Sequence, residues 1–192
     1  MLIDNTLALV LSYLNNTGLF LNIATLNKNE GRLLLKTQFR IIPFNEERLD
    51  DVVNINRTCL PENYSEYFFL NLHRRFPKTF LVAILEQKVA GYILCRIEMG
   101  LSELGKLSLT RKAHIVSLAV LPKFRKTGIA SGLLEKALVA MREYNSNESY
   151  LEVRVSNYPA INLYKKFGFE PRRTIPHYYR DGEDSLVMTK TF

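Results

Sequence analysis

The sequence predicts an α+β fold in which a mixed, mostly antiparallel sheet is flanked by helices. The first observation is the order of the predicted elements: a strand, two helices, three strands, a helix, a strand, a helix and further strands. The second is a strand that leads through a basic glycine turn into a helix, within His114–Ala137. The third is a buried strand after that helix, Tyr150–Val155, which we expect to pair in parallel with the strand at the start of His114–Ala137, in the centre of the sheet. A gap between these two strands would hold a ligand.

The composition is that of one globular domain. Hydrophobic residues make up 47% and charged residues 23% of the 192 residues, which argues against a disordered chain. Lys and Arg number 26 against 19 Asp and Glu, and the net charge of +7 suits an anionic ligand or a location near nucleic acid. The two cysteines argue against a disulfide framework and favour a reducing, cytoplasmic compartment.

The first 37 residues form an N-terminal extension of unknown role, and residues 38–192 form the domain that carries the recognisable motifs. Within the extension we predict a short helix over Leu7–Leu14. No basic segment precedes this apolar run, and it is too short for a bilayer, so we expect neither a signal peptide nor a membrane span. A cap on the core or an arm is preferred to a special function for these residues.

Short strands and helices alternate in the first part of the domain. A first strand is predicted at Phe39–Ile42, and Asn45 followed by two glutamates is typical of a helix start. That helix ends near Thr58. An aromatic segment, Tyr64–Leu72, has the length of a second helix, which Pro77 terminates.

Two antiparallel strands follow, Thr79–Leu85 and Val89–Met99, joined by a turn of hairpin length. Gly91 indicates a bulge in the second of them. We expect a polar, basic loop over Gly100–Arg111. The strand that opens the stretch His114–Ala137, called the central strand below, follows directly after it.

The stretch His114–Ala137 predicts a phosphate-binding site. Its strand is continuously apolar and β-branched, and its helix, Gly128–Tyr144, is amphipathic. Backbone N–H groups at the start of a helix have no partner within it and lie at the positive end of its dipole, and glycine allows a ligand to approach closely. Arg125 and Lys126 add positive charge. The alternative is a solvated basic turn before an ordinary surface helix.

The C-terminal part begins with the strand Tyr150–Val155. Asn157 then caps a helix with Pro159 in its first turn, and Gly168 ends that helix. The remaining predicted elements are a strand at Phe169–Arg173, a turn-rich stretch at Pro176–Asp184 and a last strand at Leu186–Thr189.

The sequence RKTGIA, Arg125–Ala130, resembles the R/Q-x-x-G-x-G/A signature of the GNAT acetyltransferases, and it lies between a strand and a helix as theirs does. Three further stretches match: LEVRVSNYPAINLYKKFGF at Leu151–Phe169, CLPENY at Cys59–Tyr64 and YYRDGED at Tyr178–Asp184. Together they are similar to the N-terminal protein acetyltransferases, specifically to the catalytic subunit of NatA in its archaeal form. The similarity runs from Phe39 to the C-terminus.

This resemblance implies a GNAT fold whose splayed parallel strands form an acetyl-CoA cleft. It implies acetyl transfer from acetyl-CoA to the α-amine of protein N-termini by direct attack in a ternary complex, without a metal. The coenzyme pyrophosphate would bind the backbone of Arg125, Lys126, Thr127, Gly128, Ile129 and Ala130. A bulge in the central strand would free amides at Leu118, Ala119 and Val120 to hold the acetyl carbonyl.

The resemblance also implies roles for two residues of the last helix region. Tyr164 matches the tyrosine that lies by the sulfur and protonates the leaving thiolate. Asn157 would touch the coenzyme. Each has an ordinary structural alternative, because Tyr164 fits a core aromatic and Asn157 fits a helix N-cap.

By the same similarity, Glu62, His114 and Glu152 are the candidate general bases. A modest base suffices, because an N-terminal amine of pKa about 7.8 is about one third neutral at about pH 7.5. The expected peptide site comprises Leu60, Pro61, Glu62, Tyr64, Tyr178 and Tyr179. A solvated loop glutamate and two half-buried turn tyrosines are the simpler alternatives for these positions.

Two other functions stay open. One is a GNAT enzyme that acts on lysine side chains or small amines, which the phosphate-binding site permits equally well. The other is a non-catalytic basic module that binds RNA or the ribosome, and only the net charge speaks for it. For the first function the partners would be nascent or mature protein N-termini, in proximity to the ribosome, and we expect no membrane or direct DNA binding.

Overall fold

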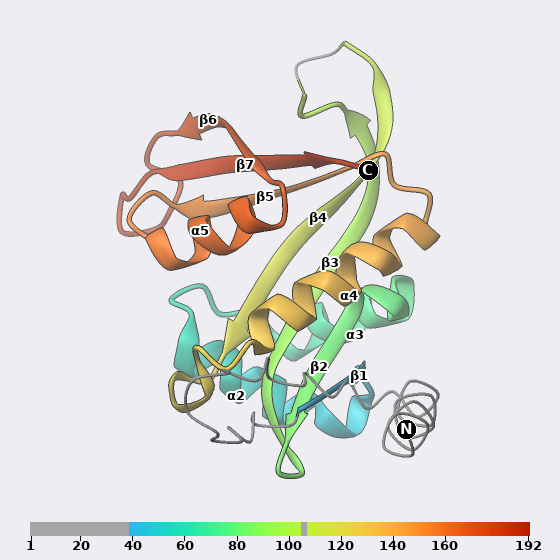
Figure 1. Cartoon of the computed structure of the whole chain (residues 1–192), viewed down its shortest axis with the longest axis vertical. Helices are drawn as coiled ribbons and strands as arrows, with labels where there is room; N and C mark the ends of the chain where they lie inside the picture. The colour runs from blue at the N-terminus through green and yellow to red at the C-terminus, as the bar shows by residue number, and fades with distance from the viewer. Residues whose placement is uncertain (1–38, 105–106) are drawn as a thin grey trace, which may run out of the picture.

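The computed structural model describes residues 39–104 and 107–192, so the predicted extension and its helix Leu7–Leu14 lie outside the described residues. A seven-stranded sheet in the order β1-β2-β3-β4-β5-β7-β6 forms the centre of the molecule (Figure 1). The predicted mixed sheet is confirmed, since β4 and β5 pair in parallel and the other described neighbours are antiparallel. The strands are β1 (Arg40–Pro43), β2 (Phe80–Leu85), β3 (Lys88–Leu101), β4 (Leu109–Val120), β5 (Glu148–Arg154), β6 (Glu170–Ile175) and β7 (Ser185–Thr191).

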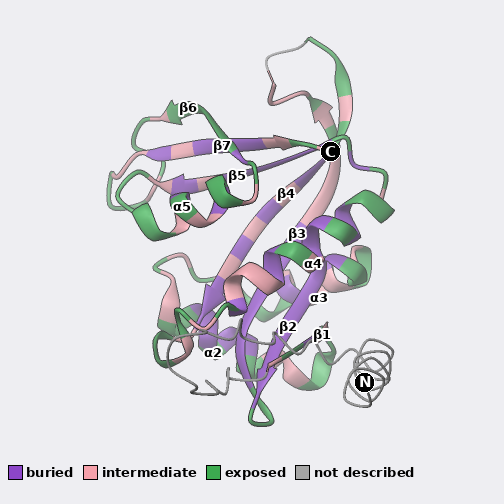
Figure 2. Cartoon of the chain, viewed as in Figure 1, coloured by how far each residue is buried: buried purple, intermediate pink, exposed green. Residues whose placement is uncertain are grey.

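Helices cover both faces of this sheet. They are α2 (Leu49–Cys59), α3 (Glu66–Arg75), α4 (Ile129–Glu143) and α5 (Tyr158–Lys166), with short 3-10 turns η1 (Glu46–Arg48), η2 (Pro77–Thr79) and η3 (Pro122–Phe124). Apolar residues of α4 and α5, such as Leu133 and Ile161, pack on one face, and Val52 of α2 and Phe69 of α3 pack on the other. Figure 2 shows the buried residues along the central strands and on the helix sides that face them.

The hairpin of β2 and β3 follows its sequence signals. Glu86 and Gln87 form the two-residue turn with φ angles of 48° and 62°, the left-handed values that suit a right-twisted hairpin. Ala83 pairs with Gly91 and Ile84 with Val89, so the extra residue Ala90 makes a bulge directly before the predicted glycine. β4 approaches the backbone of Gly91 closely at this point.

We expect Gly91→Ala to lower the free energy of unfolding by about 1–3 kcal/mol. The added Cβ would lie 2.6 Å from the carbonyl oxygen of Ala119 and 3.1 Å from the Cα of Val120, and backbone atoms cannot move aside cheaply. Gly100→Ala in the same strand is the matched control, because its Cβ would meet only the flexible end of Lys112, at 3.1 Å. Equal losses in chemical denaturation of the two variants would contradict this explanation.

The predicted loop at Gly100–Arg111 is wrong in its extent. β3 continues to Leu101 and β4 begins at Leu109, with Gly100 paired to Thr110 and Leu101 to Leu109. Charged residues typical of a loop are paired within the hairpin, since the Nζ of Lys112 lies 2.7 Å from Glu103. Pairing of the two strands provides hydrogen-bond partners for the backbone N–H and C=O groups here, and the ion pair provides a partner for the charged side chains.

Candidate active site

β4 and β5 part in the middle of the sheet. They pair over Lys112–His114 and Glu148–Tyr150 and then separate (Figure 1). In the ladder with β3, Ile115 pairs with Cys95 and Ser117 with Leu94, so Val116 is the extra residue of a bulge. A one-residue bulge reverses the alternation of side chains. His114 and Ser117 therefore face the same side of the sheet, the side that carries α2 and α3.

The position of this bulge corrects the sequence-based expectation. It was predicted near Leu118–Val120, but the structure places it at Val116, and Leu118, Ala119 and Val120 pair regularly with β3. The N–H of Leu121 bonds to the carbonyl of Ala90 in β3. Because successive peptide groups of a strand point in opposite directions, those of Leu118 and Val120 point away from β3, to the side from which β5 has separated.

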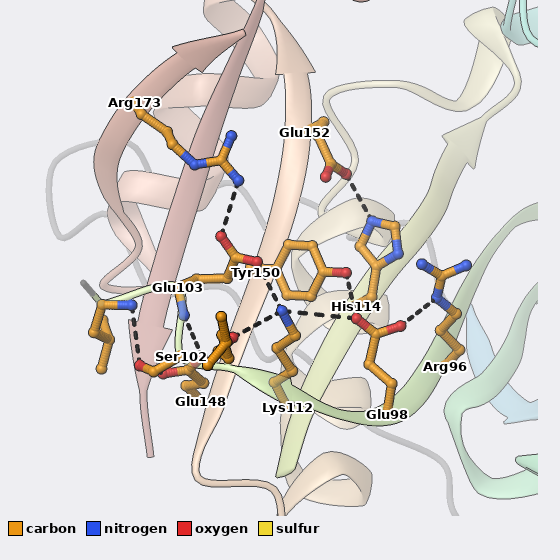
Figure 3. A network of polar contacts seen from close by, with 12 residues as sticks. Arg96, Glu98, Ser102, Glu103, Lys112, His114, Glu148, Tyr150, Glu152 and Arg173 are labelled. Carbon is orange, nitrogen blue, oxygen red and sulfur yellow. Dashed lines mark hydrogen bonds and ion pairs between the residues drawn. The ribbon is translucent and has the colours of Figure 1, made fainter. Parts of the chain in front are cut away.

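His114 and Glu152 meet across the separating strands (Figure 3). The Nε2 of His114 lies 2.7 Å from Oε2 of Glu152, and the two side chains are 12% and 15% exposed. The imidazole stacks on Tyr150 with ring centroids 4.4 Å apart and planes within 4°. The hydroxyl of Tyr150 donates to Glu98 at 2.6 Å, so the ring under His114 is itself held in place. Two of the three candidate bases thus form one fixed pair.

Arg154 joins the two loops that the sequence assigns to substrate binding. Its guanidinium lies 2.6 Å from Glu62, 2.7 Å from Asp181 and 2.8 Å from Glu183. It also stacks over the ring of Tyr179, 4.0 Å from the centroid. Hydrogen bonds from Ser156 and Arg154 lower the pKa of Glu183 to about 2, so this carboxyl is charged at neutral pH.

Sequence reasoning missed Arg154 although it lies within the matched stretch LEVRVSN. The signal was an arginine two residues after Glu152 in an otherwise apolar strand, on the same strand face by alternation. Such a cation is half-buried only when carboxylates surround it. Glu62, the third candidate base, is the partner of Arg154 and not of His114.

Two tyrosines from different loops face the same carboxylates. Burial raises the pKa of Tyr64, and the negative charges of Glu62 and Glu152 raise it further. Burial also raises the pKa of Tyr178, with further contributions from Glu152, Tyr64 and Glu62. Both phenols therefore stay protonated at neutral pH and can donate hydrogen bonds. Of the other predicted lining residues, Leu60 is partly buried against the α2–α3 core and Pro61 is exposed.

The basic turn before α4 presents unused backbone donors. Lys126 and Gly128 have left-handed φ angles of 61° and 91°, and Gly128 caps the helix without a side-chain hydrogen bond. Thr127 Oγ1 donates to the carbonyl of Phe124 at 2.7 Å, and the Nε of Arg125 donates to that of Val120 at 3.1 Å. In the described chain, none of the hydrogen bonds uses an N–H of residues 126–131. This arrangement suits an anion.

Asn157 and Tyr164 have the structural roles that the sequence left open. Asn157 Oδ1 accepts from the N–H of Ala160 at 3.3 Å and so caps α5. Tyr164 is buried in the core on the α4 and α5 side, with its ring edge against Phe169. Burial raises the pKa of Tyr164. Its hydroxyl thus lies on the sheet face opposite to His114.

The family model for the acetyltransferase (GNAT) family matches residues 49–169. The chain belongs to the GNAT family. The resemblance seen in the turn Arg125–Ala130 is thereby confirmed. No helix of this GNAT chain, within the described residues, is long and apolar enough to cross a membrane. Over the same residues, His, Cys, Asp and Glu side chains form no group of three that could hold a metal ion.

Named relatives of this GNAT chain share most of its length. A Sulfolobus acidocaldarius protein named N-alpha-acetyltransferase is 52% identical over 142 residues, which cover 73% of this chain and 84% of the relative. The crystal structure of Ard1 from Thermoplasma volcanium is 33% identical, with a TM-score of 0.70, and the match covers 80% of this chain and 97% of that one. Arabidopsis thaliana Naa50 in complex with the bisubstrate analogue CoA-Ac-MVNAL is 29% identical, with a TM-score of 0.67 and coverage of 80% and 99%.

Proposed function

We propose that this chain transfers the acetyl group of acetyl-CoA to the α-amine of protein N-termini by direct attack in a ternary complex. The observation that carries the proposal is the meeting of both substrate loops at Arg154, beside the His114–Glu152 pair. The names of the relatives support it, since the one that is 52% identical is called an N-alpha-acetyltransferase. The Naa50 structure contains an analogue in which CoA and a peptide are joined.

The coenzyme would lie on the α4 side of the separated strands. Its pyrophosphate would accept hydrogen bonds from the free amides between Arg125 and Ala130, including those of Lys126, Thr127, Gly128 and Ile129. The backbone at Leu118, Ala119 and Val120 would face the acetyl group, and a donor to the developing oxyanion typically lowers the barrier by about 3 kcal/mol. Tyr164, which keeps its proton because its pKa is raised, would donate a hydrogen bond to the leaving thiolate. Asn157 would touch the coenzyme at the start of α5.

The α-amine would approach from the other face of the sheet. His114 contacts Glu152 through Nε2 and fixes the carboxylate, whose second oxygen has no hydrogen bond to a described residue. That oxygen would take the amine proton, directly or through a water. Glu62 and Tyr64, with Leu60 and Pro61 in the same loop, would line the pocket for the first peptide residue opposite Tyr178 and Tyr179.

We expect Arg154→Gln to raise the KM for a peptide about tenfold while the KM for acetyl-CoA stays the same. The guanidinium holds Glu62 and Glu183 together, and its loss would leave two carboxylates facing each other at the entrance. Arg154→Lys should lose nearly as much, because an ammonium cannot bond with two nitrogens at once. Arg180→Gln removes an exposed arginine from the same loop and is the control; equal effects of both glutamine variants on the peptide KM would contradict the assignment.

Two short peptides test the function itself. Both contain an internal lysine, and they differ only in whether the α-amine is blocked. We expect coenzyme turnover on the free peptide and its loss on the blocked one. In the blocked peptide the lysine side chain is the remaining amine, and with a pKa of about 10.4 it is only about 0.1% neutral near neutral pH. Turnover of the blocked peptide would therefore require an enzyme that deprotonates lysine, and would favour a lysine acetyltransferase. Failure to bind acetyl-CoA at all would favour the non-catalytic basic module.

We also propose that the chain acts in the cytoplasm on nascent or mature N-termini, near the ribosome. The net charge of +7 and the free thiols of Cys59 and Cys95 support this location. Residues 38–192 are proposed as the catalytic domain, with residues 1–37 as an extension to it.

A further inference from the structure

A buried chain of hydrogen bonds crosses the core under the candidate site. The Nδ2 of Asn56 in α2 donates to the hydroxyl of Tyr92 in β3 at 3.0 Å. That hydroxyl lies 2.7 Å from the Oγ of Ser117 in β4. Asn56 and Tyr92 are 0% exposed and Ser117 is 5% exposed. The three side chains therefore connect α2 with the residue that directly follows the bulge at Val116.

Asn56 also holds the backbone of the loop that carries Glu62. Its Oδ1 accepts from the N–H of Tyr64 at 3.1 Å, and its Nδ2 donates to the carbonyl of Glu62 at 3.3 Å. With Tyr92 as the further partner, the amide group uses both donor hydrogens and its acceptor. One side chain thus fixes both ends of the segment Glu62–Tyr64.

The hydroxyl of Tyr92 is the middle member of this row of hydrogen bonds. Tyr92 accepts from Asn56, and either of the two hydroxyls of Tyr92 and Ser117 can donate to the other. Burial raises the pKa of Tyr92 to about 12, and the proton stays on the hydroxyl at neutral pH. Each of the three side chains, from Asn56 to Ser117, thus has at least one hydrogen-bond partner.

The hydroxyl of Tyr92 is not needed to fill the core. The ring packs edge-on against Phe69 and Phe80, with centroids 5.9 and 6.3 Å away, and a phenylalanine would make the same contacts. Buried polar groups in an apolar core add little net stability, but when fully paired they fix one arrangement. The arrangement fixed here is the placement of a loop relative to a strand bulge.

We propose that Asn56, Tyr92 and Ser117 are positioning residues that set the distance between the peptide loop Glu62–Tyr64 and the bulge in β4. This inference rests on the proposed function, because the loop would bind the peptide terminus and the strand would hold the acetyl group. A loop that shifts relative to β4 would still bind peptide but would hold the α-amine away from the acetyl carbon, and small displacements of this kind reduce the rate strongly.

A double-mutant cycle on the full chain tests the proposal. Tyr92→Phe and Ser117→Ala both remove the hydrogen bond between Tyr92 and Ser117, and Tyr92→Phe also removes the bond from Asn56. Each should lower kcat/KM for a free-amine peptide by about five- to tenfold. The KM for acetyl-CoA should not change. The double variant should lose no more than the stronger single variant, because Tyr92→Phe already removes the contact that Ser117→Ala removes. Tyr144→Phe, which removes a tyrosine hydroxyl that makes no hydrogen bond to a described residue, is the matched control.

Hydrogen exchange gives a readout that does not depend on activity. The N–H of Tyr64 bonds to Asn56, so its exchange should be faster in Tyr92→Phe than in the wild type and unchanged in Tyr144→Phe. Wild-type turnover of the free-amine peptide reports on the proposed function separately. If the wild type is active but the losses multiply, if both KM values change together, or if Tyr64 exchange is unaltered, the positioning role is overturned. An inactive wild type would overturn the function on which the inference rests.

Discussion

We expect Gly128→Asp to abolish acetyl-CoA binding while the protein stays folded. Gly128 is exposed at the start of α4 with a φ of 91°, and the nearest atom to an added Cβ is Cε1 of Phe39 at 4.0 Å. The side chain therefore fits sterically, but it places a carboxylate among amides that would bind phosphate, and like charges repel. Calorimetric titration with acetyl-CoA and a circular-dichroism melt measure the two parts of this expectation.

Gly182→Asp is a matched control for that experiment. Gly182 has a φ of 87° and nothing within 4 Å of an added Cβ, so the same backbone strain and the same charge enter the molecule in the β6–β7 loop. Acetyl-CoA affinity should be kept in this variant. Gly128→Ala separates strain from charge, and it should weaken binding less than Gly128→Asp. Unchanged affinity in Gly128→Asp would refute the placement of the pyrophosphate.

The second large effect is expected at Glu152. Glu152→Gln should lower kcat/KM for a free-amine peptide by about 100-fold near pH 6.5, within the usual range for a general base. The loss should shrink as the pH rises, because an N-terminal amine of pKa about 7.8 is about 5% neutral at about pH 6.5 and mostly neutral at about pH 9. A steady-state pH profile of both enzymes measures this.

Glu98→Gln is the control for Glu152→Gln. It neutralises a carboxylate of the same network, but Glu98 contacts Tyr150 and not the imidazole of His114. Its loss should be smaller and independent of pH. A loss at Glu152 that stays constant with pH would show that Glu152 orients His114 and does not take the proton, and full activity would remove it from the reaction.

Local signals were sufficient to predict most of the fold. The apolar spacing of α4, the Asn157 cap and the hairpin turn each depend on neighbours within a few residues, and each was correctly predicted from them. The end of β3 at Leu101 and the start of β4 at Leu109 were missed because their stability comes from pairing with each other and from ion pairs such as Lys112–Glu103. Those contacts depend on the folded hairpin.

The site could be predicted only in pieces. The turn Arg125–Ala130 is contiguous in sequence, so its motif was visible. Arg154, Glu62 and Glu183 come from distant parts of the chain, and only the sheet brings them together. The bulge was placed too late, because nothing local distinguishes Val116 from the other apolar residues of the strand. Its position is visible only in the register with β3, where Cys95 pairs with Ile115 and Leu94 with Ser117.

The short parallel contact between β4 and β5, three residues long, also affects the order in which the two parts of the sheet form during synthesis. Strands β1 to β4 are sequential neighbours, so a chain still being synthesised can form them, with α4, from local contacts. Glu152, Arg154 and both entrance tyrosines arrive afterwards, with the strands that join through that short contact. An unfinished chain that ends before Glu148 would contain the turn Arg125–Ala130 but would lack Glu152 and Arg154, so the proposed site can form only once the C-terminal strands have been made.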